Sequence, residues 1–394
     1  MWLLAGLLCP LAAVAQIDPM PRKLIQLGYN GALQGHPPLA AYAFYYRNQP
    51  DFIRTNLTLR LAIAPTYLDS ELGISQALGS HTDLGIGLAG GGFADSYDEI
   101  RGGTYLPSES FTGHGGEVSL SIYHRFNPER QIPLNGVLRA TAHYTTYQRD
   151  EQTARGFRLP EDHGTFSIRT GLRWGGKEPI LFPALAMELS VWYEGRLRTG
   201  VGTYGFGDRE LRRDSHSFWA QSLLAYTMTN SGQSFFLSLT AGATINPDRF
   251  SAYRLGALLP LVSEFPLSLP GYYYQEISAQ KFVLLGGNYI IPLDKKDHWN
   301  VNFTATTAGV DYLSGLQQPG RWHSGVGAGL LYKTGSLKVM AGYAYGIDAI
   351  RSSGRGAHSI GILMQVDLEH AKELFNTEPG RWRGLQRILG TFSD

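Results

Sequence analysis

The alternation of apolar and polar residues along short segments is the feature that most constrains how this chain folds. In 359–368, Ile360, Ile362 and Met364 alternate mostly with polar residues and glycines, and the same two-residue period recurs in 166–174, 299–307 and 337–347. Successive side chains of a β-strand point to opposite faces, so this period predicts strands with one apolar face and one polar face. Such strands are typical of a transmembrane β-barrel, whose outer face meets lipid and whose inner face lines a polar lumen.

The connections between these segments support the same fold. Short turns, such as 230–233 and 334–336, alternate with long loops, such as 94–113, 200–216 and 246–278. Bacterial barrels have short periplasmic turns, longer external loops and an even number of strands. The sequence therefore predicts an all-β protein, a transmembrane antiparallel β-barrel of about 16 strands over 24–368. The strands are expected near 24–33, 38–47, 53–65, 70–78, 83–93, 114–126, 136–149, 163–175, 185–199, 217–229, 234–245, 279–293, 298–309, 323–333, 337–348 and 358–368.

The first residues have the pattern of an export signal. Residues 1–15 are apolar and end on Ala13-x-Ala15, which is the small-residue pattern of a signal peptidase site. The alternative is an N-terminal core helix. Cleavage would leave 16–23 as a short periplasmic N-terminus and would remove Cys9, the one cysteine of the chain, so the mature protein would have no disulfide and no thiolate chemistry. We therefore expect the protein in the outer membrane of a Gram-negative-type bacterium, with membrane lipid as its surroundings.

Charge and motifs argue against several other functions. The net charge of +1 gives no reason to expect a nucleic-acid partner. The sequence has no cysteine cluster or histidine spacing for a metal and no nucleotide motif, so we expect no cofactor and no metal. An outer-membrane lipid hydrolase would need a serine activated by a histidine. The candidate pairs are His216-Ser217 and His358-Ser359, but neighbours on a strand point to opposite faces, so no catalytic residue is assigned.

Charged residues are concentrated on the predicted inner faces of four neighbouring strands. This expected lumen charge layer consists of Arg125, Arg139, Arg169, Arg173, Glu188 and Glu194. One interpretation is a positive constriction that favours anions. The interpretation that we prefer is a ladder of charge-assisted hydrogen bonds that stiffens the wall, because acidic and basic residues are interleaved.

The segment after the last strand, 369–394, is expected to be a C-terminal periplasmic tail. Its apolar residues Trp382, Leu385, Ile388, Leu389 and Phe392 share one helical face. The preferred interpretation is a short amphipathic helix on the inner leaflet of the membrane. The alternatives are a plug inside the lumen, a handle for a partner protein and a disordered tail.

Residues 250–368 resemble the end of the barrel in the bacterial surface antigen family, which includes the assembly factor BamA and the two-partner secretion transporters. The sixth external loop carries the motif residues Arg254, Gly256, Leu269, Pro270, Gly271 and Tyr272, which are similar to the family's aromatic-x-x-Gly-Gly and Val-Arg-Gly-Phe/Tyr runs. The last strand carries Ser359, Gly361, Met364 and Val366, which are similar to the signal by which such barrels are recognised for insertion. The resemblance implies a surface-antigen-type barrel with this loop folded against its wall.

The sequence departs from the family pattern in three ways. Pro270 replaces the motif's arginine, 299–307 lacks the acidic partner, and fewer than ten mature residues precede the first strand, so periplasmic modules are not expected on this chain. Active insertion or secretion by this chain alone is therefore not expected.

Three functions are left open by the sequence. The first is a porin-like channel or a partner-dependent structural barrel for passage across the outer membrane. The second is a translocation or assembly subunit that works with separate periplasmic modules. The third is a lipid-modifying enzyme, which we do not expect. Loop 246–278 is unusually apolar, so it is expected to enter the barrel or to meet an external partner.

Overall fold

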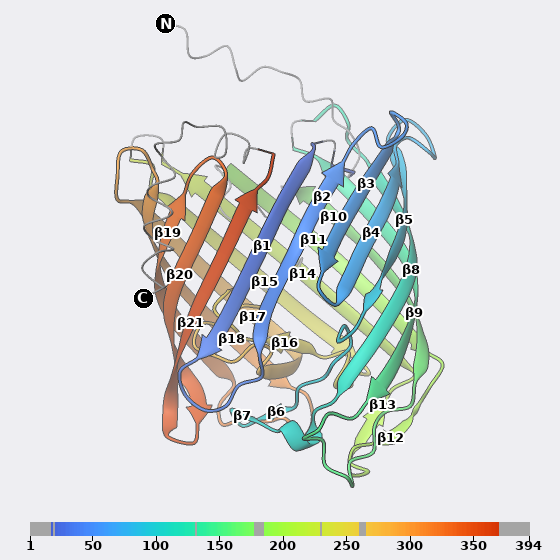
Figure 1. Ribbon diagram of the computed structural model, residues 1–394, viewed down its shortest axis with the longest axis vertical. Helices are drawn as coiled ribbons and strands as arrows, with labels where there is room; N and C mark the ends of the chain where they lie inside the picture. Colours follow the sequence, from blue (N-terminus) through green and yellow to red (C-terminus); the bar gives the residue numbers. More distant parts are fainter. Residues whose placement is uncertain are drawn as a thin grey trace, which may run out of the picture.

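A closed antiparallel barrel of sixteen strands forms the body of the protein (Figure 1). The computed structural model describes residues 17–18, 20–130, 132–176, 185–228, 231–259 and 265–369. Each strand of the wall pairs with the next one along the chain, and the last strand pairs with the first from Leu24↔Asp367 to Ala32↔Ser359. This final pairing leaves no open edge, as the absence of water in a bilayer requires.

The wall is formed by the following strands: β1 (Arg22–Ala32), β2 (Ala40–Gln49), β3 (Leu57–Ala64), β4 (Tyr67–Ile74), β5 (Thr82–Gly91), β8 (Thr112–Arg125), β9 (Leu134–Gln148), β10 (His163–Gly175), β11 (Leu185–Arg198), β14 (Asp214–Thr227), β15 (Ser234–Ile245), β17 (Ile277–Pro292), β18 (Trp299–Tyr312), β19 (Trp322–Lys333), β20 (Leu337–Arg351) and β21 (Gly354–Asp367). The remaining elements belong to the long loops: β6 (Ile100–Arg101), β7 (Thr104–Tyr105), the 3₁₀ turn η1 (Pro107–Glu109), β12 (Gly202–Tyr204), β13 (Arg209–Leu211) and β16 (Tyr253–Leu255). We call the end with the long loops external.

All sixteen expected strands are present, and the strand-by-strand order is confirmed. The predicted start of β3 at residue 53 is wrong. Residues 52–56 form a tight turn, in which the Leu57 N–H donates to the Arg54 carbonyl and Ile53 has a φ of 64°. Local hydrogen bonds of this kind replace those of the ladder.

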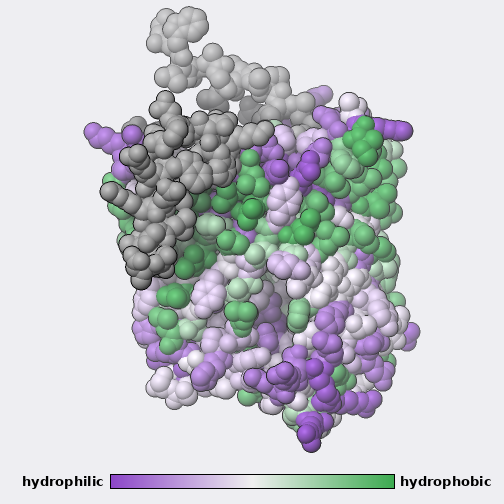
Figure 2. All heavy atoms as spheres, viewed as in Figure 1, coloured by the Kyte–Doolittle hydropathy of each residue, from purple (hydrophilic) through white to green (hydrophobic). Residues whose placement is uncertain are grey.

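The two faces of the wall differ as the alternation predicted. Side chains such as Leu88, Leu120, Ile168, Leu239 and Phe303 point outward and are 40–55 % exposed. Figure 2 shows apolar residues over the wall and hydrophilic residues gathered at the end with the long loops. Because the wall is closed and its outward side chains are apolar, the barrel is suited to span a bilayer.

The inner face has two unlike halves. From β8 to β14 it is polar, with inward residues such as Ser119, Thr141 and Ser190. From β17 to β21 it is apolar, with Leu284, Leu331 and Leu363 almost completely buried. An apolar inner face in an aqueous lumen needs a covering segment.

Several predicted segments lie outside the described residues. These are the signal peptide 1–15 and the whole of the tail from residue 370 onward, including its predicted amphipathic helix and Trp382, Leu385, Ile388, Leu389 and Phe392. In the described part of the chain, no helix is both long enough and apolar enough to cross a membrane.

Candidate functional site

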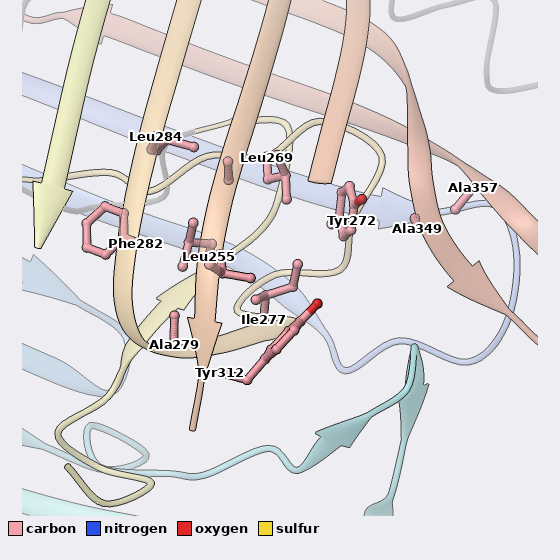
Figure 3. Packing of buried hydrophobic residues seen from close by; sticks show 12 residues of the cluster. Leu255, Leu269, Tyr272, Ile277, Ala279, Phe282, Leu284, Tyr312, Ala349 and Ala357 are labelled. Carbon is pink, nitrogen blue, oxygen red and sulfur yellow. The ribbon is translucent and has the colours of Figure 1, made fainter. Parts of the chain in front are cut away.

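The segment that covers the apolar half is loop 246–278, which we call the lumen loop. It is described over 246–259 and 265–278. Its strand β16 pairs with the start of β17 through Arg254↔Ser278 and Leu255↔Ile277. From there Leu255, Leu269 and Tyr272 pack into one buried cluster with wall residues of β17 and β18 (Figure 3). The apolar composition of the loop thus has a structural explanation, since the loop is folded inward.

The lumen loop reaches the seam between the first and the last strand. The side chain of Asn30 on β1 binds both backbone groups of Leu259, with its Oδ1 accepting from the N–H at 3.0 Å and its Nδ2 donating to the carbonyl at 3.4 Å. On the neighbouring strand β21, a Cβ added to Gly361 would lie 2.9 Å from Leu259 Cγ. Leu259 of the lumen loop therefore contacts both strands of the seam from inside.

The tip of the lumen loop fits against glycines of the wall. A Cβ on Gly325 of β19 would lie 2.1 Å from the carbonyl oxygen of Pro270. A Cβ on Gly271 would lie 1.8 Å from the backbone nitrogen of Gly346 on β20, and Gly271 has a φ of 87°. Only glycine fits such close backbone approaches.

A buried ion pair fastens the loop behind its tip. Arg351 at the end of β20 binds Glu276 through two parallel contacts of 2.9 Å, and their side chains are 1 % and 0 % exposed. The Arg351 guanidinium also stacks on the ring of Tyr273, 3.7 Å from its centroid. The Tyr273 N–H donates to Glu276 Oε2 at 2.7 Å. This two-contact geometry is the strong form of an ion pair.

A hydrogen-bonded chain forms the second fastening. The Tyr272 hydroxyl lies 3.2 Å from His323 Nδ1, and His323 Nε2 contacts the hydroxyl of Tyr312. Tyr312 in turn donates to the carbonyl of Gly320 at 2.9 Å. His323 is fully buried, and the chain connects the loop tip to the external end of β18 and β19.

The lumen loop also reaches the polar half of the wall. Phe265 packs edge-on against the stacked rings of Trp192 on β11 and Trp219 on β14, with centroid distances of 5.2 and 5.4 Å. Its described parts therefore touch β1, β11, β14 and β17–β21.

The other long loops pack together over the external end, and we call this assembly the loop cap. Tyr97, Phe111, Phe157 and Tyr204 form its buried aromatic cluster. Glu99 is fully buried beside it, and Arg249 of the lumen loop donates to its Oε2 at 3.0 Å. Burial alone would raise the pKa of Glu99, but the hydrogen bond and charge of Arg249, with the charge of Arg209, hold that pKa below its usual value. The cap is thus tied to the lumen loop by a carboxylate that stays ionised.

The predicted motif residues of the sixth loop come together. Leu269 and Tyr272 lie in the buried cluster, and Pro270 and Gly271 form the tip. Arg254 donates to the carbonyl of Asp98 at 2.6 Å and stacks on Tyr97, so it belongs to the cap. Gly256 has a φ of 153°, and a Cβ there would lie 2.0 Å from the Tyr273 carbonyl oxygen.

Five of the six residues of the expected charge layer lie on two cross-strand rows, whereas Glu188 pairs with Gly175 and lies on neither. Arg139, Arg169 and Glu194 are register partners in one row, and Arg173 shares the other with Asn135 and Arg125. Glu194 binds both Arg169 (2.6 Å) and Arg196 (2.6 Å), and Arg139 lies 3.4 Å from Glu117. Arg173 contacts Glu188 at 3.2 Å, and Arg125 donates to the Arg130 carbonyl at 3.0 Å. This pairing is the geometry of a ladder.

The last-strand signal and the serine–histidine pairs can also be placed. Ser359 and Gly361 face the lumen, whereas Met364 and Val366 lie on the outer side, paired with Leu27 and Ile25 of β1. Ser217 contacts Thr244, and His216 contacts Tyr193 on the other face. His358 contacts Tyr343. Among the described residues neither pair forms a serine–histidine hydrogen bond.

The anchors Asn30, Glu276, His323 and Arg351 were not found from the sequence. Each is a single polar residue at a strand end or in a strand, and its partner is far away in the chain. A buried polar residue signals such a role only once its burial is known.

Together these features define a class of protein: an outer-membrane-type β-barrel whose sixth external loop is folded into the lumen. No protein-family model matches the sequence, and a comparison with curated proteins gives no match. Solved structures share the fold. CdiB from Acinetobacter baumannii aligns with a TM-score of 0.59 at 10 % identity, over 88 % of this chain and 60 % of its own.

Two further structures give the same result. CdiB from Escherichia coli has a TM-score of 0.59 at 12 % identity, over 89 % of this chain and 64 % of its own. BamA from Haemophilus ducreyi, in a form lacking POTRA domains 1–3, has a TM-score of 0.55 at 12 % identity, over 88 % of this chain and 70 % of its own. The chain spans less than two thirds of either CdiB chain, and its barrel has the fold of these outer-membrane proteins.

Proposed function

We propose that this chain is a translocation or assembly barrel of the outer membrane whose lumen loop closes the pore at rest and moves before anything passes. The observation that carries the proposal is the Glu276–Arg351 pair, which is almost completely buried and holds the loop across the apolar half of the lumen. A buried pair is costly to break, so it favours one defined position of the loop over many loose ones.

The comparisons support a role with partners. The CdiB and BamA chains extend beyond the part that this chain matches. The BamA structure is that of a form lacking POTRA domains 1–3. In this proposal, modules that handle a client polypeptide are supplied by separate proteins, and the chain itself supplies the membrane passage.

A crosslink of the loop to the seam tests the proposal. The sole cysteine, Cys9, lies in the predicted signal peptide, so Leu259→Cys with Gly361→Cys introduces one defined pair. A Cβ at position 361 would lie 2.9 Å from Leu259 Cγ, which is within the reach of a disulfide. The measurement is conductance of the purified full chain in planar bilayers, oxidised and then reduced.

The expected result is brief openings in the wild-type and reduced proteins and silence in the oxidised protein. A second variant, with 257–270 replaced by Gly-Ser-Gly, should conduct steadily. Steady conductance of the oxidised protein would sink the proposal, because current would then pass with the loop fixed in place.

A solute-selective pore is the second candidate, and the polar half of the wall favours it. There Arg139, Arg169 and Glu194 lie side by side in one row of the inner face. The same recordings separate the two candidates. Strong ion selectivity of the wild-type openings would favour the pore, and openings without selectivity would favour the translocation barrel.

A further inference from the structure

Two stacked tryptophans, which we call the indole pair, lie on the polar half of the inner wall. Trp192 of β11 and Trp219 of β14 are register partners, with ring planes 9° apart and ring centroids 6.1 Å apart. A Cβ on Gly171 of β10 would lie 2.3 Å from Cε3 of Trp192, so the glycine leaves the space that this indole fills. Large apolar rings on a wall that faces a polar lumen need a partner to cover them.

Arginines hold both indoles in place. The guanidinium carbon of Arg173 lies 5.3 Å from the centroid of the Trp192 ring, and that of Arg169 lies 5.6 Å from the centroid of the other ring. Both are cation–π distances. Each arginine is itself bound by a carboxylate, Arg173 by Glu188 and Arg169 by Glu194. The indole pair is therefore a pre-organised apolar surface, and the charges beside it are already paired.

One residue of the lumen loop occupies this surface. Phe265 packs edge-on against both indoles, and it does not belong to the buried cluster that holds the rest of the loop. Trp192 is 6 % exposed, whereas Trp219 and Phe265 are half-buried, so the phenyl ring covers the pair from the lumen side. Edge-on packing favours an aromatic ring over an aliphatic side chain of similar size. The loop itself thus shows which side chain the surface accepts.

The wall beside the pair also offers hydrogen-bonding groups. Gln221 lies two residues beyond Trp219 on the same face of β14, is half-buried and pairs in register with Ser190. Its side-chain amide takes part in no hydrogen bond among the described residues. An amide donates and accepts at once, as a peptide backbone does. The indole pair and this amide together match a short piece of extended polypeptide that carries an aromatic side chain.

We infer that the indole pair is a binding site for aromatic side chains of an unfolded polypeptide in transit, and that Phe265 occupies it at rest. The inference rests on the proposed function, because a translocation barrel is what brings such a polypeptide into the lumen. A client ring that displaces Phe265 makes the same two edge-on contacts, so the exchange is nearly balanced in free energy. The client would then loosen the loop from this part of the wall while it binds there.

Binding of model peptides to the full chain in detergent tests the inference. The reporter is a neutral Gly-Ser peptide with one central 4-fluorophenylalanine, followed by fluorine NMR, which detects the weak binding of a single ring. The competitors are the same peptide with phenylalanine, the same peptide with alanine, and N-acetylphenylalaninamide. The variant Phe265→Ala vacates the indole pair.

Phe265→Ala should bind the reporter at least about tenfold more tightly than the wild type, whose own ring competes from within the loop. On that variant the phenylalanine peptide should displace the reporter at a concentration at least about tenfold lower than the alanine peptide, because only the former buries a ring. Equal displacement by these two peptides, or equal binding by variant and wild type, would overturn the inference. Displacement by N-acetylphenylalaninamide as effective as by the peptide would also overturn it, in favour of a small aromatic solute.

Further variants locate the binding. Adding Trp219→Leu to Phe265→Ala should weaken reporter binding at least about tenfold, and unchanged binding would refute the assignment to the indole pair. If that double variant does not fold, the peptide competition on Phe265→Ala alone still decides the question. The matched control is Phe206→Ala, at a phenylalanine of an external loop that is 57 % exposed, and it should bind as the wild type does.

The inference and the proposed function can fail separately. Silence of the crosslinked barrel without any preference for the phenylalanine peptide would keep the pore closure and overturn the inference. Steady conductance of the crosslinked barrel together with ring-dependent binding would overturn the closure, and the indole pair would then be a binding site in an open pore.

Discussion

At the scale of single residues, the position of the lumen loop depends on polar groups that are buried only because each has a specific partner. Arg351 touches the Glu276 carboxylate, the Tyr273 ring and the Gly271 carbonyl, so three partners compensate its charge, although its Nε donates to no group among the described residues. Such an arrangement adds little net stability over an apolar one, but it is costly to break from one side.

Removal of one partner is therefore expected to cost far more than removal of both. Arg351→Met should lower the free energy of unfolding by about 3–5 kcal/mol, and the double variant Glu276→Gln with Arg351→Met should recover most of that loss. Urea unfolding in lipid vesicles, followed by tryptophan fluorescence, measures both. The control is Arg355→Met, which breaks a pair with Asp348 in which Arg355 is 72 % exposed and should cost at most about 1 kcal/mol. Equal losses for Arg351→Met and Arg355→Met would contradict the role of the pair.

At the scale of elements, the strands were predictable and the anchors of the loop were not. Each wall strand can be predicted from the two-residue alternation within its own segment, because this alternation is a local property of the sequence. The start of β3 was missed because a local turn at 52–56 overrides that period. The pairing of Glu276 with Arg351 leaves no local trace, since it depends on how β20 is placed beside the loop.

The family resemblance predicted that the sixth loop folds against the wall. It did not predict which residues hold the loop there. The loss of the motif's arginine at Pro270 was visible in the sequence. The fastening by Arg351, His323 and Tyr312 was not visible, because these three residues belong to no motif. Parity predicted the charges of the inner face, and the partner of each charge follows only from the register of the strands.

The glycines of the wall give an element-scale prediction. Gly325→Ala should displace the loop tip, because its Cβ would lie 2.1 Å from the Pro270 carbonyl oxygen. The matched control is Gly287→Ala on β17, where a Cβ would lie 3.9 Å from the Phe236 carbonyl oxygen, an ordinary contact distance. Limited proteolysis of the folded protein should cut within 257–275 in the first variant and not in the second. Equal resistance of the two would show that the tip does not depend on this contact.

At the scale of the whole molecule, the barrel is a container with two different inner surfaces. The lumen loop covers the apolar half of the inner face. On the polar half, charged side chains pair with each other. The outer face of the wall is apolar, because its outward side chains face lipid.

The outer surface gives a prediction that distinguishes the two faces of one strand. Leu239→Arg, at an outward position in the middle of β15 that is 45 % exposed, should lower the free energy of unfolding in lipid by about 2–4 kcal/mol. Ser238→Arg, one residue earlier and facing the lumen, should cost clearly less. Urea titration in phospholipid vesicles compares them, and a larger loss for Ser238→Arg would mean that the faces are assigned the wrong way round.

The contact of Leu259 with both Asn30 and Gly361 has a consequence for how the barrel is made. The closing pairing joins the first strand to the last, across almost the whole chain, and contacts so distant in sequence form slowly. The lumen loop is synthesised after β1 and before β21, and it binds both. Once the lumen loop is bound to β1, it presents a surface on which β21 can dock beside β1. The pairing of β21 with β1, which closes the barrel, should therefore form faster. A barrel with a shortened loop would then be slow to close even where its finished wall is just as stable.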